Sequence, residues 1–85
     1  MPESKVGHVK EYFAKVGVAG IDITEGHLSV GDTIHIKGHT TDLTQQVDSI
    51  QLEHQSLQRA EPGQVIGVKV RERVRPHDQV FKVTE

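Results

Sequence analysis

The stretch from residue 28 to residue 38, Leu-Ser-Val-Gly-Asp-Thr-Ile-His-Ile-Lys-Gly, constrains the fold of this chain more than any other. Val30-Gly31-Asp32 predicts a tight turn, because glycine accepts positive φ and aspartate can hydrogen-bond its own backbone. Thr33 to Lys37 alternates apolar and polar side chains, which is the period of a strand with one buried face and one solvated face. Gly38 marks the end of that strand. The other segments are expected to be strands that cover this unit.

The balance of apolar residues extends the strand prediction to the whole chain. The 85 residues include 18 valines and isoleucines together, but only 7 leucines and alanines together. Branching at Cβ restricts χ1 and favours strands over helices. We therefore predict an all-β chain, and at this length we expect one domain, residues 1–85, with its core from about residue 6 to residue 83.

About six strands are predicted from the periodic runs, and they are spaced as in a sandwich or a barrel. Their approximate ranges are 6–13, 15–24, 33–37, 43–54, 64–74 and 79–83. A closed barrel is favoured, because closure removes the exposed edges of so small a sheet. A bulge is expected at Gly20, where the alternation slips. Residues 55–61 are expected to form a connector or a single helical turn.

The alternation also predicts which side chains are buried. The residues expected inside the barrel are Ile34, Ile36, Ile50, Leu52, Ile66, Val68 and Val70. Val47 falls on the opposite face from Ile50 and Leu52 unless the strand bends or changes its partner, which small barrels require. Gln45 lies on a polar run, so its replacement by alanine is expected to change the stability little.

Several classes of function have no support in the residues. The chain has no cysteine, which excludes disulfides, Cys-based zinc sites and thiol nucleophiles. The six histidines are scattered, and none of their spacings supplies the three or four ligands of a metal site. No nucleophile is placed with a base and an orienting acid. We therefore expect no enzyme, no metal and no cofactor.

The cellular location is predicted from two features that the sequence lacks, a signal peptide and a membrane-spanning segment. Residues 1–5 lack the apolar run of a signal peptide. No stretch approaches the ~20 apolar residues that a membrane helix needs. A cytoplasmic protein without a membrane partner is therefore expected.

Four cations alternate along the predicted strand 64–74 and the residue after it. Lys69, Arg71, Arg73 and Arg75 are expected to form an outward stripe about 20 Å long, because a strand sends alternate side chains to one face. Such a stripe is a candidate nucleic-acid-binding site, since arginine contacts phosphate through two hydrogen bonds. The alternative is a solvated face whose cations pair with neighbouring carboxylates, namely Glu61, Glu72 or Asp78. The net charge of −2 requires any basic surface to be local.

Tyr12 and Phe13 are the only adjacent aromatic residues. They are candidates for a base-stacking platform. The alternative is that one of the two points into the core, because neighbours on a strand face opposite sides.

Three segments resemble the second domain of translational GTPases such as elongation factor Tu. They are Leu28-x-Val30-Gly31-Asp32-x-Ile34-x-Ile36, Ala60-Glu61-Pro62-Gly63-Gln64-Val65-Ile66-Gly67-Val68 and Asp78-Gln79-Val80-Phe81. The resemblance extends over nearly the whole chain, from about residue 6 to residue 83. It implies a small six-stranded Greek-key β-barrel, in agreement with the fold predicted from the residues.

The resemblance also bears on ligands. The larger factors carry a GTP-binding domain, but this sequence has no Gly-x-x-x-x-Gly-Lys-Ser/Thr phosphate loop, so no GTP binding is expected. In elongation factor Tu the barrel helps to hold the aminoacylated end of tRNA. An acidic residue and an arginine of that pocket fall on Gln51 and His54 here, so neither residue type is kept. Similar barrels also occur at the C-terminus of some bacterial collagenase-like peptidases.

Two functions follow from these observations. The cations and the resemblance predict a non-catalytic, translation-factor-like module that contacts RNA or a ribonucleoprotein. The alternative is a protein-interaction barrel that serves as a partner or accessory domain of a larger enzyme such as a collagenase-like peptidase. An aromatic patch beside the cations would favour RNA, whereas an exposed apolar patch would favour a protein partner.

Overall fold

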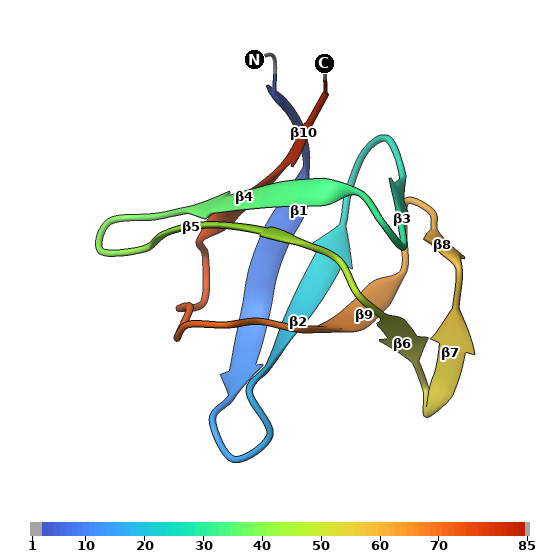
Figure 1. Ribbon diagram of the computed structural model, residues 1–85, viewed down its shortest axis with the longest axis horizontal. Helices are drawn as coiled ribbons and strands as arrows, with labels where there is room; N and C mark the ends of the chain where they lie inside the picture. The colour runs from blue at the N-terminus through green and yellow to red at the C-terminus, as the bar shows by residue number, and fades with distance from the viewer. Residues whose placement is uncertain (1–2, 85) are drawn as a thin grey trace.

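The computed structural model describes residues 3–84, which contain ten β-strands and no helix (Figure 1). This confirms the predicted all-β class. None of these residues belongs to a helix long and apolar enough to cross a membrane, and the cytoplasmic location stays a prediction. The strands are β1 (Glu3–Phe13), β2 (Val18–Ile23), β3 (Leu28–Ser29), β4 (Thr33–Lys37), β5 (Asp42–Gln46), β6 (Ile50–Leu52), β7 (Gln55–Leu57), β8 (Arg59–Ala60), β9 (Val65–Lys69) and β10 (Gln79–Val83).

Six principal strands form the barrel, as predicted. The main sheet has the order β5-β4-β10-β1-β2-β9-β6-β7. Only residues 47–49 separate β5 from β6, so these two strands are halves of one bent strand. One half pairs with β4 and the other half pairs with β9, which joins the two ends of the sheet. The principal strands are therefore β1, β2, β4, β5 with β6, β9 and β10.

The remaining strands are short additions. β3 pairs with β8, and β7 pairs with β6. Residues 55–61, expected as a connector or a helical turn, thus contain two strands. The last strand, β10, returns to lie between β1 and β4, which is a Greek-key type of connection (Figure 1).

The long strand β1 bends around the barrel through two irregularities. Its register with β10 shifts between Lys5 and Gly7, and its register with β2 shifts between Val9 and Glu11. The second shift lies opposite Gly20, where a bulge was predicted, but the extra residue belongs to β1. A Cβ at Gly7 would lie 2.0 Å from a backbone oxygen, so the first bend requires glycine.

One hydrophobic core fills the barrel, and it confirms most of the predicted interior. Six of the seven predicted residues are buried, and Leu52 is half-buried. Val47 is 1% exposed because the chain bends there, as the pattern required. The core consists of Val6, Val9, Ala19, Ile21, Ile23, Leu28, Ile34, Ile36, Leu43, Val47, Ile50, Ala60, Ile66, Val68, Val70, Val74 and Val80.

The predicted turn at Gly31 holds that bend in place. Gly31 has a φ of 97°, which glycine adopts without strain. Its N–H donates to the carbonyl of Val47 at 2.8 Å, and the N–H of Val47 donates to the carbonyl of Asp32 at 2.8 Å. The carboxylate of Asp32 accepts from the N–H of Ser29 at 2.8 Å. These hydrogen bonds therefore hold the turn at Gly31 and the bend at Val47 together.

His35 connects three strands on the outer face of the barrel. Its Nδ1 lies 2.8 Å from a carboxylate oxygen of Glu3, and its Nε2 lies 2.5 Å from a carboxylate oxygen of Asp42. The hydrogen bond to Asp42 is the largest cause of a raised His35 pKa, the interactions with Glu3 add to it, and partial burial opposes it. The imidazolium form is therefore favoured in the folded state.

The stability of the fold should fall as the pH rises through the titration of His35. A pKa that is raised on folding gives a contribution that is complete below about pH 6.5, the value of an unfolded histidine, and lost above the folded-state pKa. Urea unfolding at several values between about pH 6 and 8 measures this for the parent and for His35→Gln. The parent should lose more stability over this range than the variant. Equal losses would contradict the role of His35.

Candidate functional site

Two glycines face each other on the outer surface of the barrel. Gly20 of β2 lies opposite Gly67 of β9. On either side of this pair, Glu11 lies opposite Gly20 and Gln51 lies opposite Gly67. One row across four strands therefore has side chains at its ends and none in its middle. Gly20 is buried and Gly67 is half-buried, and both line a shallow groove of about 330 Å³.

Apolar side chains also line this groove. Phe13 is 47% exposed and Val65 is 40% exposed, and both line the groove. A Cβ on Gly20 would lie 3.8 Å from Cε2 of Phe13, so the phenyl ring lies beside this glycine. Tyr12 instead packs against the core, so the two adjacent aromatic residues do not form one platform. The groove therefore offers a ligand apolar contact with two exposed side chains.

The turn between β6 and β7 supplies polar side chains to the groove. Glu53 and His54 both line it, with φ angles of 50° and 68°. Such a two-residue hairpin loop favours glycine or asparagine, because other residues are strained in this region by roughly 1–2 kcal/mol each. Strain at two side chains that face a groove makes them candidates for function. Gln51 and His54, the positions matched through the family resemblance, both belong to this groove.

The four predicted cations lie outside the groove. Strand β9 ends at Lys69, so the prediction that this strand continues to Val74 is wrong. Residues 70–77 have no strand structure. Val70 and Val74 are nevertheless buried. The alternation persists because this irregular segment also covers the core. The cations after Lys69 therefore do not follow a strand, and the regular stripe about 20 Å long that the alternation predicted is not formed.

The cations themselves are exposed, as expected. Lys69, Arg71, Arg73 and Arg75 all have exposed side chains. Within residues 3–84 no ion pair joins any of them to a carboxylate. Glu61, one predicted partner, pairs with Arg59 at 2.7 Å instead. That these cations bind nucleic acid stays a prediction.

Gln45 holds the segment that carries the first two cations. Its side-chain amide donates to the carbonyl of Lys69 at 2.8 Å, and its side-chain oxygen accepts from the N–H of Arg71 at 2.8 Å. The residue is buried. The expectation that Gln45 is unimportant is therefore wrong, because a polar residue in a polar run satisfies backbone groups of a distant segment.

No cluster of three or more potential metal ligands is found among residues 3–84. What the described residues present is a small antiparallel barrel with an open groove and an exposed cationic segment.

The chain belongs to the elongation factor Tu domain 2 family, whose model matches residues 17–75. This confirms the resemblance found in the sequence. Among solved structures, the C-terminal domain of a Geobacillus thermoleovorans protein assigned to the U32 peptidases is similar, with a TM-score of 0.88 and 25% identity. The match covers 95% of this chain and 93% of that domain.

Two curated relatives are proteases. A collagenase of Porphyromonas gingivalis is 41% identical over 78 residues, which cover 91% of this chain and 22% of the collagenase. An uncharacterized protease of Methanocaldococcus jannaschii is 37% identical over 82 residues, which cover 95% of this chain and 20% of that protein. The chain therefore spans about a fifth of the length of these relatives.

Replacement of Gln45 by alanine should destabilise the fold by about 1–3 kcal/mol, because it leaves the backbone groups of Lys69 and Arg71 without partners. Gln46→Ala is the matched control, since Gln46 is the same residue type one position later and is exposed. Urea unfolding of both variants provides the measurement. Equal midpoints would show that the two hydrogen bonds contribute nothing to stability.

Proposed function

We propose that this chain is a non-catalytic accessory barrel of a collagenase-like U32 peptidase and that it docks against the catalytic part of that enzyme. The observation that carries this proposal is the extent of the match to the proteases. Nearly all of the chain aligns with about a fifth of the collagenase, at 41% identity. A similar barrel is the C-terminal domain of a protein assigned to the U32 peptidases. The catalytic groups then belong to the other four fifths of such a protein.

The groove between Phe13 and Val65 is the proposed docking surface. These two side chains are exposed and apolar, and both line the groove, so an apolar side chain of a partner can pack between them. Glu11 and Glu53 add negative charge at the edges of the groove. The complementary partner is a protein segment with an apolar side chain and a neighbouring basic residue.

Isothermal titration calorimetry of the chain with Porphyromonas gingivalis collagenase that lacks the matching region tests this proposal. Phe13→Ser and Val65→Ser should each weaken binding at least about tenfold, because each removes apolar area from the contact. Val16→Ser is the matched control: Val16 is 60% exposed but does not line the groove. No binding, or equal weakening by Val16→Ser, would overturn the proposal.

RNA binding by the cationic segment is the second candidate function. It is favoured by the exposure of Lys69, Arg71, Arg73 and Arg75 without carboxylate partners among residues 3–84. An exposed aromatic ring also lies nearby, since Phe13, Val18 and Lys69 are paired in one row across three strands. Phosphates would contact the cations, and a base would stack on the phenyl ring.

Fluorescence anisotropy of labelled single-stranded RNA over a salt series tests the second candidate. Four phosphate contacts give a slope of log K on log salt of at most about −3, and replacement of Arg71 and Arg73 by glutamine should reduce its magnitude by about 1.4. Affinity for all sequences should fall alike, because phosphate contacts carry no base information. Lys10→Gln with Lys15→Gln is the control, because both lysines are exposed and the change of charge is the same. A parent that does not bind at low salt, or equal slopes in both double variants, would contradict RNA binding by this segment.

A further inference from the structure

Two carboxylates that line the groove have no cationic partner within the described part of the chain. Glu11 and Glu53 are both exposed, and none of the ion pairs among residues 3–84 includes either of them. By contrast, the carboxylate of Asp32 pairs with the ammonium of Lys82 at 3.3 Å. The groove therefore presents two negative charges that cations of a partner can neutralise.

These two carboxylates belong to opposite ends of the groove. The row of paired residues that crosses the groove begins with Glu11 on β1 and ends with Gln51 on β6. Glu53 follows Gln51 by two residues and lies in the turn between β6 and β7. Three strand spacings of about 4.8 Å separate β1 from β6, so the row is about 14 Å long.

Apolar side chains flank this row on both sides. Phe13 follows Glu11 by two residues on β1, and Val65 precedes Gly67 by two residues on β9. Because β1 and β9 both run antiparallel to β2, they run in the same direction, so Phe13 and Val65 lie on opposite sides of the row. The two middle positions of the row are Gly20 and Gly67, and neither carries a side chain that would block a segment lying along the row.

The length of the row matches one spacing of an extended peptide. A strand rises about 3.3 Å per residue, and its alternate side chains point to the same face. Residues i and i+4 of an extended segment are therefore about 13 Å apart on one face, with residue i+2 midway between them. In a helix the same two residues are only about 6 Å apart along the axis, so an extended segment fits the row better.

We propose that the groove binds an extended protein segment in which basic residues at positions i and i+4 flank an apolar residue at position i+2. One basic side chain pairs with Glu11 and the other with Glu53, and the apolar side chain packs between Phe13 and Val65. This inference rests on the proposed docking role of the groove, and it specifies the segment of the enzyme that docks.

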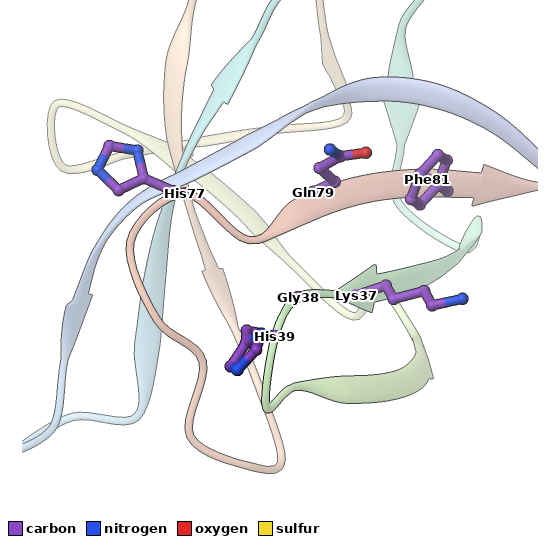
Figure 2. A pocket seen from close by; sticks show the side chains of 6 residues that line it. All are labelled: Lys37, Gly38, His39, His77, Gln79 and Phe81. Atoms are coloured by element: carbon purple, nitrogen blue, oxygen red, sulfur yellow. The ribbon is translucent and has the colours of Figure 1, made fainter.

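A second hollow on the barrel does not offer this combination of groups. It has a volume of about 530 Å³, lies where the end of β4 meets the start of β10, and shares no residue with the groove (Figure 2). Figure 2 shows the ammonium of Lys37 and the ring of His77 at opposite ends of this hollow, and no carboxylate of a described residue lines it. His39 and His77 line only this hollow, so their resonances report binding outside the groove.

NMR titration of the isotope-labelled chain with synthetic peptides tests the inference. The probe is acetyl-Gly-Arg-Thr-Leu-Thr-Arg-Gly-amide, whose arginines and leucine have the proposed spacing. It should shift the amide resonances of Phe13, Gly20 and Gly67 and leave those of His39 and His77 unchanged. Absence of binding, or shifts centred on the two histidines, would overturn the proposal.

Two further peptides test the spacing and the apolar contact while the protein stays unaltered. Acetyl-Gly-Leu-Arg-Arg-Thr-Thr-Gly-amide has the same composition, but its arginines are adjacent, so only one of them reaches an end of the row. It should bind at least about tenfold more weakly than the probe. Replacement of the leucine of the probe by serine should weaken binding by a similar factor, because the apolar contact is lost. Equal affinity of either peptide and the probe would contradict the proposed recognition.

Matched changes of charge locate the site on the protein. Glu11→Gln with Glu53→Gln should weaken binding of the probe at least about tenfold, because both charge-assisted contacts are lost. Glu25→Gln with Glu72→Gln is the control, since both residues are exposed, lie outside the groove and take part in no ion pair among residues 3–84. An equal effect of the two double variants would show that the groove carboxylates do not recognise the arginines.

The peptides also separate this inference from the docking role on which it rests. If the chain binds the truncated collagenase but not the probe, the inferred segment is wrong and the docking role stands. If the chain binds the probe but not the truncated collagenase, the groove recognises the inferred segment and that collagenase does not supply it.

Discussion

Two backbone hydrogen bonds between the turn at Gly31 and the bend at Val47 hold the point at which this barrel closes. Gly31 donates to the carbonyl of Val47, and Val47 donates to the carbonyl of Asp32. Between them they fix the point at which one strand leaves β4 and joins β9. Without that point the sheet would end in two open edges, which are sites of aggregation in small β-proteins. The positive φ of Gly31 permits the turn, and the burial of Val47 stabilises the bend.

The same bent strand contacts both the cationic segment and the groove. Before the bend, Gln45 holds the backbone of Lys69 and Arg71 and so fixes where the cationic segment leaves the barrel. After the bend, Gln51 pairs with Gly67 and ends the glycine row of the groove. The bend that closes the barrel therefore also sets the positions of the cationic segment and the groove.

Most of the fold could be predicted from the sequence, because valine and isoleucine mark one face of each principal strand. The same signal failed after Lys69, since Val70 and Val74 are buried from an irregular segment as well as they would be from a strand. The role of Gln45 was not predictable, because it depends on a segment that lies 24 residues away along the chain. The pairing of Gly20 with Gly67 was not predictable either, because it depends on the register between β2 and β9. Parts of the groove were indicated by the family resemblance, through Gln51 and His54, and by the aromatic residue Phe13.

Charge is distributed unevenly over this barrel, although the net charge of the chain is only −2. The groove has Glu11 and Glu53 at its edges, which would repel phosphate and favour the basic protein segment proposed as its partner. The exposed cations of residues 69–75 have no carboxylate partner among the described residues, which would favour an anion there. A ligand suited to one of these surfaces would therefore be disfavoured at the other, and repulsion of this kind contributes to specificity as much as attraction does. Because none of residues 69–75 lines the groove, the proposed protein partner would leave these cations accessible.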